Sequence, residues 1–277
     1  MIAVSIDGML VAPEHAVVSV FDRGFLFGDG VFEVFRTWDE TAVDLEAHLA
    51  RLYSSAGVLA IKAMPPDRLA EATVRTLANS GPGEKRVRVV LTRGPGPLLA
   101  RPDALGPGRA IVIVEPLPAQ PTELSLAIVD WPLPRRAGAG HKTLAYLDHI
   151  FARELAANAG ADEAVRLGPD GDVVECATAN LFIVAAGEVI TPPVELGVLP
   201  GVTRARALVA CAESGITAHE RRFTPEQLAA ADEIFITSAV RGVVPVTRLD
   251  GVVRAAGQVT ARVKEGYLAE LRPQTVA

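Results

Sequence analysis

Apolar and polar residues alternate with two different spacings over residues 1–116. Apolar side chains at every second position predict strands over 31–37, 86–92 and 110–115. Apolar side chains three to four residues apart predict helices over 44–59 and 66–79. Short elements of both kinds in this order predict a compact α+β unit.

Three prolines within seven residues follow this unit, in Glu115-Pro-Leu-Pro-Ala-Gln-Pro121. Proline disfavours both helix and central strand, so residues 117–122 are expected to link an N-terminal domain over 1–116 to a C-terminal domain over 123–277. The C-terminal pattern predicts strands and helices in turn. The strands are expected over 124–129, 173–176, 181–184 and 233–237, and the helices from residue 142 onward, over 203–214 and over 260–271.

Composition limits what the chain can be. With 277 residues, 49% of them hydrophobic, it can form a substantial core. A net charge of -6 argues against nucleic acid or an anionic membrane as partner. The sequence has no export signal and no apolar run of about 18 residues, so a cytoplasmic location is expected. Cys176 and Cys211 lack metal-ligand spacing, which predicts reduced packing residues and no metal ion.

Lysine is scarce, because only four of the 27 Lys and Arg residues are lysines. Lys62 and Lys85 lie beside predicted turns, and Lys264 lies on a charged C-terminal helix. Lys142 instead follows the glycine-rich segment 137–140 and opens an amphipathic stretch. A buried amine in such a setting favours a Schiff base with an aldehyde cofactor. Lys142 is therefore the candidate catalytic residue.

A single carboxylate, Glu175, lies in the otherwise small and apolar stretch 174–182. A buried carboxylate needs a cationic partner, and the protonated ring nitrogen of pyridoxal phosphate is one. The turn 197–201 leads into the helix predicted from Thr203, whose free N–H groups would suit a phosphate. Arg51 is a candidate second phosphate contact. Together these features predict a site for pyridoxal 5′-phosphate.

Six segments carry a family resemblance, namely 22–36, 48–55, 142–155, 174–184, 197–204 and 235–247. In this order they resemble the class IV aminotransferases, the fold-type IV pyridoxal phosphate enzymes. The resemblance implies an α+β fold of two domains, a smaller N-terminal α/β domain and a larger C-terminal domain with a mixed β-barrel-like core. The family's site is completed by a loop of the neighbouring subunit, so a homodimer with a shared active site is implied.

The same resemblance implies residue roles. Lys142 would be the Schiff-base lysine and proton shuttle, and Glu175 would pair with the pyridine nitrogen. The phosphate would be held by Arg51, by the backbone of Val202 and Thr203, and by the Ser238-Ala239 turn.

Strand alternation places Phe32, Val34 and Arg36 on one face of the predicted strand, with Glu33 and Phe35 on the other. The resemblance puts the first three positions near the substrate. Arg36 is then either a contact for the substrate carboxylate or a member of a surface ion pair.

Arg93 belongs to Thr92-Arg-Gly94, which resembles a Thr-Arg-Gly motif of the family. It would either bind the substrate carboxylate or anchor its loop. The Arg-x-His that D-amino-acid enzymes carry shortly afterwards is missing, because this chain continues Pro-Gly-Pro-Leu-Leu-Ala-Arg101-Pro.

Similarity over 27–35, 48–56 and 237–246 favours the D-amino-acid branch. We therefore expect an enzyme that moves an amino group from a D-amino acid or (R)-amine to a 2-oxo acid, in a ping-pong mechanism through Lys142. Three alternatives stay open. Glu175-Cys176 followed by Ala-Asn-Leu-Phe is similar to 4-amino-4-deoxychorismate lyase, and a branched-chain aminotransferase or a noncatalytic cofactor-binding homologue also fits.

Overall fold

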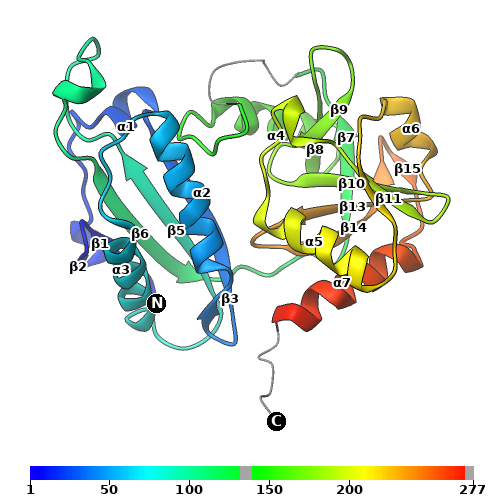
Figure 1. Ribbon diagram of the computed structural model, residues 1–277, viewed down its shortest axis with the longest axis horizontal. Helices are drawn as coiled ribbons and strands as arrows, with labels where there is room; N and C mark the ends of the chain where they lie inside the picture. Colours follow the sequence, from blue (N-terminus) through cyan, green and yellow to red (C-terminus); the bar gives the residue numbers. More distant parts are fainter. Residues whose placement is uncertain (132–138, 272–277) are drawn as a thin grey trace. The chain divides into compact units, whose positions relative to one another are not determined.

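The computed structural model describes residues 1–131 and 139–271, which divide into two compact units (Figure 1). The first unit comprises Met1–Ala119 together with His141–Tyr146, and the second comprises Gln120–Gly140 and Leu147–Ala277. The first break along the chain thus comes after Ala119. Part of the glycine-rich segment before Lys142 and the end of the expected C-terminal domain lie outside the described residues.

The first unit is an antiparallel sheet with helices packed against it (Figure 1). Its strands are β1 (Ala3–Ile6), β2 (Met9–Val11), β3 (Gly30–Trp38), β4 (Thr41–Ala42), β5 (Lys85–Thr92) and β6 (Arg109–Pro116). Its helices are α1 (Arg23–Phe27), α2 (Leu45–Val58) and α3 (Pro66–Ala78), with short 3-10 turns η1 (Pro13–His15) and η2 (Pro102–Ala104). The strand order within the described part is β2-β1-β6-β5-β3-β4.

Burial along β3 confirms the predicted alternation of its two faces. Glu33, Phe35 and Thr37 are fully buried, whereas Val34 and Arg36 are half-buried. The buried set faces α2, because the ring of Phe35 stacks on His48 of that helix at 4.8 Å between centroids. The opposite face therefore carries Phe32, Val34 and Arg36.

The second unit is built on a mixed sheet. Its strands are β7 (Leu124–Ile128), β8 (Glu163–Leu167), β9 (Val173–Cys176), β10 (Asn180–Ala185), β11 (Glu188–Thr191), β12 (Ala218–Glu220), β13 (Glu233–Ser238), β14 (Gly242–Leu249) and β15 (Val252–Val253). Its helices are α4 (Leu147–Asn158), α5 (Val202–Glu213), α6 (Pro225–Ala230) and α7 (Gln258–Leu271), with the 3-10 turn η3 (Val194–Leu196). The order is β12-β11-β10-β13-β14-β7-β8-β9, with β15 beside β14, and the β11/β12, β14/β7 and β7/β8 pairs are parallel.

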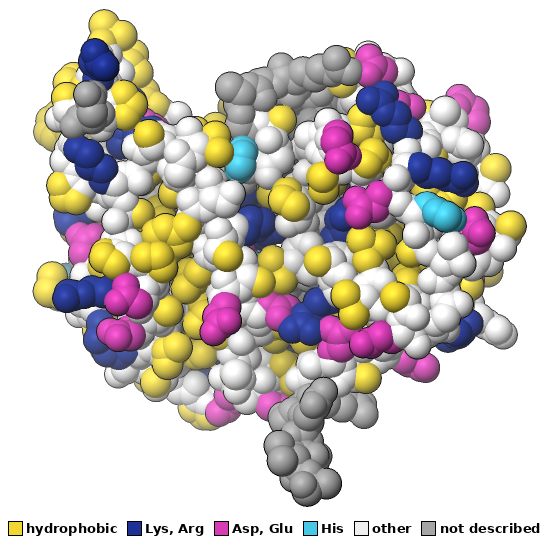
Figure 2. Space-filling model, in the orientation of Figure 1, with side chains coloured by type: hydrophobic (Ala, Val, Ile, Leu, Met, Phe, Trp, Pro, Cys, Tyr) yellow, Lys and Arg dark blue, Asp and Glu magenta, His cyan; other side chains and the backbone are white. Residues whose placement is uncertain are grey.

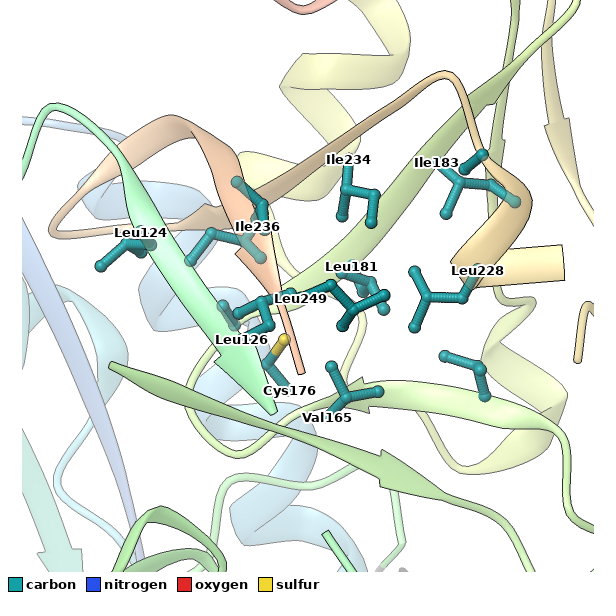
Figure 3. Packing of buried hydrophobic residues seen from close by; sticks show 14 of the residues in the cluster. Leu124, Leu126, Val165, Cys176, Leu181, Ile183, Leu228, Ile234, Ile236 and Leu249 are labelled. Carbon is teal, nitrogen blue, oxygen red and sulfur yellow. The ribbon is translucent and has the colours of Figure 1, made fainter. Parts of the chain in front are cut away.

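The strands of the second unit curl around one apolar cluster (Figure 3). Leu126 of β7, Val165 of β8, Cys176 of β9, Leu181 of β10 and Ile236 of β13 all belong to it. Inward side chains of distant strands can meet in one cluster only if the sheet bends toward itself. The expected barrel-like core is therefore confirmed.

Helices cover the outer surface of this sheet. Phe182 and Phe235 stack at 4.6 Å and pack with Ala210 of α5 and Tyr267 of α7. On another part of the surface, Ala152 and Ala156 place α4 against Ala127 and Ala164. Small side chains let the α4 backbone approach the strands closely.

The helix expected from Lys142 begins instead at Leu147, so that part of the prediction is wrong. The Phe32 N–H donates to the Lys142 carbonyl at 2.9 Å, the Leu144 N–H donates to the Gly30 carbonyl at 2.9 Å, and Thr143 bridges Val31. These bonds occupy backbone groups that a helix would use internally. They also place residues 141–146 in the first unit.

The charged surface fits the composition. Figure 2 shows acidic and basic side chains interspersed on the face in view, which agrees with a net charge of only -6. Within 1–131 and 139–271, no helix has both the length and the apolar character that crossing a membrane requires.

Candidate active site

Lys142 lies on the extended segment beside β3, with two aromatic rings around its amine. Its Nζ is 4.5 Å from the ring centroid of Phe32 and 5.3 Å from that of Tyr146. The two rings meet edge to face, with centroids 5.3 Å apart. The residue is half-buried, so the expectation of a buried amine is too strong. The rings fix the direction of the amine and shield one side of it from water.

The other lysines differ from the expectation in one respect. Lys85 is more buried than Lys142, although the sequence placed it in a turn. Its Nζ donates to the carbonyls of Pro82 and Gly83, at 2.6 and 2.5 Å. Lys62 Nζ donates to the Leu105 carbonyl at 2.8 Å. Both amines donate to loop carbonyls. Of these three lysines, Lys142 is the one whose amine lies against aromatic rings.

Phe32 lies next to Lys142, whereas Arg36 contacts its own end of β3. The Arg36 Nε donates to the Thr37 carbonyl at 2.9 Å, and its guanidinium lies 5.3 Å from the Trp38 ring centroid. Arg36 is four positions from Phe32, about 13 Å along an extended strand. Substrate contacts by Val34 and Arg36 stay predictions.

Arg88 is a cation that the sequence interpretation missed. It lies on β5 directly opposite Val34, and so on the same face as Phe32. Its guanidinium carbon is 4.9 Å from the Phe32 ring centroid. Burial, followed by the like charge of Arg86, lowers the pKa of the Arg88 guanidinium. The alternation Arg86-Val-Arg88 on a predicted strand was the available signal, because it puts both arginines on one face.

Arg93 anchors its loop. Its Nε pairs with Asp29 Oδ2 at 2.7 Å, and its terminal nitrogens donate to the carbonyls of Leu59 at 2.7 Å and Ala60 at 3.0 Å. Arg23 also reaches Asp29 Oδ2, at 2.8 Å. Burial alone would raise the pKa of Asp29, but the hydrogen bonds and charges of both arginines outweigh it and lower that pKa. Of the two readings open for Arg93, these contacts support loop anchoring.

Arg51 is held by a buried acid. Its Nε and Nη2 each lie 2.7 Å from one carboxylate oxygen of Glu33, and His48 Nδ1 lies 2.8 Å from Glu33 Oε2. Burial would raise the pKa of Glu33, but hydrogen bonds from His48 and Arg51 and their charges outweigh it and hold that pKa below 4.5. The paired geometry orients the Arg51 guanidinium. Its contact with a phosphate stays a prediction.

Glu33→Gln is expected to lower the free energy of unfolding at neutral pH by about 3 kcal/mol, because the buried pair loses its charged partner. The folded-state pKa of Glu33 is depressed, so its contribution is present above pH 4.5 and is lost as the pH falls through the folded value. Urea unfolding at neutral and acidic pH measures both effects. Glu115→Gln, at the more exposed ion pair with Arg86, should cost under about 1 kcal/mol. Equal losses of unfolding free energy in the two variants would contradict a larger contribution from the buried Glu33–Arg51 pair.

In the second unit, Glu175 is buried, and its carboxylate accepts hydrogen bonds from a backbone N–H and a side-chain amide. Its Oε2 accepts from the Leu199 N–H at 3.1 Å and from the Asn180 amide at 3.3 Å. The same amide donates to the Leu199 carbonyl at 2.9 Å. Cys176, the next residue, points into the apolar cluster (Figure 3), so Glu175 points away from it.

Asn180 is the residue around which the predicted cofactor contacts of this unit gather. It pairs in register with Thr237, which directly precedes the Ser238-Ala239 turn. Its Oδ1 would lie 2.0 Å from a Cβ placed on Gly201, the N-cap of α5. No side chain caps that helix, whose first residues are Val202 and Thr203. The second unit thus brings three features close to the Asn180 side chain. They are the buried Glu175 carboxylate, the N-terminus of α5, which favours an anion, and the Ser238-Ala239 turn with its hydroxyl group.

Arg241 was not expected near this turn. Its backbone N–H and its Nε donate to the Ser238 hydroxyl at 3.3 and 3.1 Å. Its Nη2 lies 2.7 Å from Thr178 Oγ1 and 3.2 Å from Glu163 Oε2. No spacing in the sequence signals this network, because its members are up to 78 residues apart.

Gly201→Ala is expected to displace Asn180 and the start of α5, at a cost of roughly 1–3 kcal/mol in unfolding free energy and with weaker cofactor binding. The reason is the 2.0 Å approach of the added methyl to Asn180 Oδ1. Thermal unfolding and cofactor titration measure the two effects. Gly57→Ala in α2 is the matched control, because its Cβ meets nothing within 4 Å, and it should stabilise the protein slightly. A Gly201→Ala protein as stable as wild type would refute the close packing.

Two other kinds of site find no support. Among the described residues, no group of three or more His, Cys, Asp or Glu side chains could hold a metal ion. Burial raises the pKa of the Cys176 thiol well above its usual range and that of Cys211 to about 11. Such thiols are poor nucleophiles at neutral pH.

Comparison with known proteins places the chain among related sequences and structures. A family model described as amino-transferase class IV matches residues 30–249. A putative branched-chain-amino-acid aminotransferase of Methanocaldococcus jannaschii is 35% identical, covering 95% of this chain and 94% of the relative. A D-alanine aminotransferase of Bacillus licheniformis is 30% identical, covering 91% and 89%. The branched-chain aminotransferase of Thermoproteus uzoniensis, solved with norvaline, superimposes with a TM-score of 0.91 at 30% identity, covering 97% of this chain and 94% of that one.

Proposed function

This chain belongs to the class IV aminotransferases, and we propose that it transfers the amino group of an α-amino acid to a 2-oxo acid. The amino donor that we expect it to prefer is an L-branched-chain amino acid. Enzymes of this class use pyridoxal 5′-phosphate, which supplies an aldehyde for the amino group and a ring that withdraws electrons from the substrate's α-carbon. The observation that carries the proposal is the arrangement at Phe32, where the Lys142 amine and the Arg88 guanidinium both lie against one ring.

Each residue then has a distinct task. Lys142 would hold the aldehyde, and its Nζ, once free, would accept the proton from the substrate's α-carbon. The rings of Phe32 and Tyr146 keep that amine oriented. Glu175 would keep a proton on the pyridine nitrogen through its carboxylate.

The phosphate would be bound mainly by backbone groups. The first N–H groups of α5, at Val202 and Thr203, and the Ser238-Ala239 turn offer donors to an anion. Arg51, oriented by Glu33, would add a charged contact. The residues present therefore suit a cofactor with an aldehyde, a basic ring nitrogen and a phosphate.

Arg88 supports a donor that carries a carboxylate. A half-buried guanidinium beside Phe32 attracts an anion, which an amino acid supplies and a simple (R)-amine does not. The branched-chain donor is favoured by the relative at 35% identity and by the loop after Arg93, which lacks Arg-x-His.

A D-amino acid is the second candidate donor. The resemblance over 27–35, 48–56 and 237–246 favours it, and D-alanine aminotransferases are 28–30% identical over at least 91% of the chain. Glu175-Cys176 and the residues that follow support a lyase, which the donor test would also detect.

The donor test uses the cofactor-loaded protein without any acceptor. L-Leucine, D-alanine and (R)-1-phenylethylamine are added separately, and the loss of the cofactor's visible absorbance is followed. We expect L-leucine to cause the fastest loss. A faster loss with D-alanine would establish the D-specific enzyme instead. Release of pyruvate from aminodeoxychorismate, with no response to any amino donor, would establish the lyase.

We also propose a homodimer in the cytoplasm. The family resemblance supports the dimer, and so does an apolar stripe on α4, where Leu147, Ile150, Phe151 and Leu155 are each at least 40% exposed. The two free, buried cysteines fit a reducing compartment. Sedimentation velocity of the loaded protein tests the dimer, and a monomer at micromolar concentration would contradict it.

A further inference from the structure

Arg166 is a fully buried arginine in β8. Arg166 is 0% exposed and is one of the largest completely buried side chains among the described residues. Removing a guanidinium from water is costly, and proteins offset this cost with a nearby anion. The burial of Arg166 therefore points to an anionic neighbour.

The strand register identifies that neighbour as Glu175. β8 and β9 are antiparallel, and Arg166 lies directly opposite Glu175. Directly opposed residues share a face, with Cβ atoms about 5 Å apart. The next pair, Val165 and Cys176, points into the apolar cluster (Figure 3), so Arg166 and Glu175 share the other face.

A β-bulge immediately precedes Glu175. The register shifts between Arg166 and Leu167, so Val174 is an extra residue in β9. A bulge bends its strand and changes the direction of the adjoining side chain, and bulges are frequent beside active sites. The bulge thus sets the direction of the Glu175 side chain, and the residue opposite Glu175 is the cationic Arg166.

Two of the contacts of Arg166 are with neutral groups. Its Nε lies 3.4 Å from the Trp131 carbonyl, and its Nη1 lies 3.4 Å from His149 Nδ1. His149 Nδ1 is also 2.7 Å from the Ala177 carbonyl, so it carries the hydrogen and donates there. The Arg166 contact with His149 is therefore one of packing. Neither contact offsets the positive charge of Arg166.

We propose that Arg166 is a positioning residue that keeps Glu175 ionised and directed toward the cofactor's ring nitrogen. The inference rests on the proposed function, in which Glu175 pairs with that nitrogen. The Leu199 N–H and the Asn180 amide are neutral donors to Glu175, and burial disfavours the charged form of a carboxyl group unless positive charge lies nearby. Arg166 supplies positive charge from the neighbouring strand.

The consequence is a specific pH dependence of cofactor binding. With Arg166 present, Glu175 meets the protonated ring nitrogen as a carboxylate and releases no proton. Without Arg166, Glu175 in the cofactor-free protein takes up a proton at mildly acidic pH. That proton must leave on binding, so the affinity falls by up to about tenfold for each further pH unit.

Other titratable groups near the pair are the same in every protein compared. Among the residues that the structure describes, they include His149 on α4, Cys176 beside Glu175, and the Glu163–Arg241 ion pair at 3.2 Å. Contributions that do not depend on Arg166 cancel when variants are compared with wild type. Any contribution that changes with Arg166, as at His149 3.4 Å from its Nη1, is the same with and without the Glu175 carboxyl and is separated by the Glu175→Gln background.

The experiment measures the Kd of pyridoxal 5′-phosphate for cofactor-free protein between about pH 5.5 and 8. From the neutral to the acidic end, Kd of Arg166→Met is expected to rise about tenfold more than that of wild type. Arg166→Lys keeps the charge and should stay near wild type. Arg254→Met is the matched control, because Arg254 donates to the Ala231 carbonyl at 2.7 Å in the same unit, and its profile should not change.

A second background tests whether the effect acts through Glu175. In a Glu175→Gln protein, Arg166→Met should add no pH dependence, because no carboxyl remains to titrate. An equal increase in that background, or identical profiles for the Met and Lys variants, would overturn the proposal. Should Arg166→Met fail to fold, Arg166→Gln is measured and read in the same way.

Different results would contradict the proposed function and the role of Arg166. If the wild-type protein binds no pyridoxal 5′-phosphate, or if borohydride does not attach it to Lys142, the proposed function is wrong. If wild type binds the cofactor and Arg166→Met has the wild-type pH profile, only the role of Arg166 is wrong.

Discussion

Lys142→Ala is expected to lower kcat by about 10⁴-fold or more. The residue supplies both the covalent link to the cofactor and the base that moves the α-proton, and no other lysine shares its setting beside Phe32 and Tyr146. Steady-state turnover and the absorbance change of the isolated half-reaction measure the loss. The folded state should persist, because the Lys142 backbone bond to Phe32 does not depend on the side chain.

Two controls accompany this variant. Lys264→Ala, on α7, removes a lysine of similar exposure and should leave kcat within about twofold. Borohydride reduction of the loaded wild-type protein followed by peptide mapping should label position 142. A label on Lys62 or Lys85 instead, with activity retained in Lys142→Ala, would exclude Lys142 as the catalytic residue.

Glu175→Gln is expected to lower kcat by roughly 10²–10³-fold while cofactor affinity falls by less than about tenfold. A glutamine oxygen can still accept from the Leu199 N–H, so the local shape is kept. The neutral amide cannot hold a proton on the ring nitrogen, which weakens the electron-withdrawing power of the ring. Turnover measures the first effect, and a binding titration measures the second.

Glu195→Gln provides the comparison for the loss of one charge, because Glu195 is exposed in the η3 turn of the same unit. It should leave both quantities unchanged. Equal losses in kcat and affinity for Glu175→Gln would mean that the residue holds the cofactor without tuning it. No loss in either would remove Glu175 from the site.

Much of the secondary structure could be predicted from local patterns. The strand expected over 173–176 occurs as Val173–Cys176, and the helix expected over 44–59 occurs as Leu45–Val58. Strands β8 and β14 were missed, because Arg166 interrupts one apolar run and Pro245 the other. Each interrupting residue lies opposite a residue of the adjoining antiparallel strand, Glu175 for Arg166 and Phe235 for Pro245, and these pairings cannot be read from the apolar pattern of one strand.

The site residues likewise divide into those that the sequence identified and those that only the structure identified. Lys142 and Glu175 could be selected from the sequence, since each is an isolated reactive group among residues of a different kind. Arg88 was missed and Arg93 was left undecided, because arginine is common in this chain. Only the pairing of β3 with β5, and the carbonyls that surround Arg93, distinguish their environments.

The sequence by itself determined which reactive groups the protein contains. They are the rare amine of Lys142 and the carboxylate of Glu175 among apolar neighbours, with glycines where the backbone must turn. Periodicity added most helices and strands, because it reflects contacts within a few residues. Only the tertiary structure decided that residues 141–146 pair with β3, that Asn180 gathers the second unit's cofactor contacts, and that Arg166 faces Glu175. Register and burial depend on segments far apart in the chain, and no local pattern of apolar and polar residues contains that information.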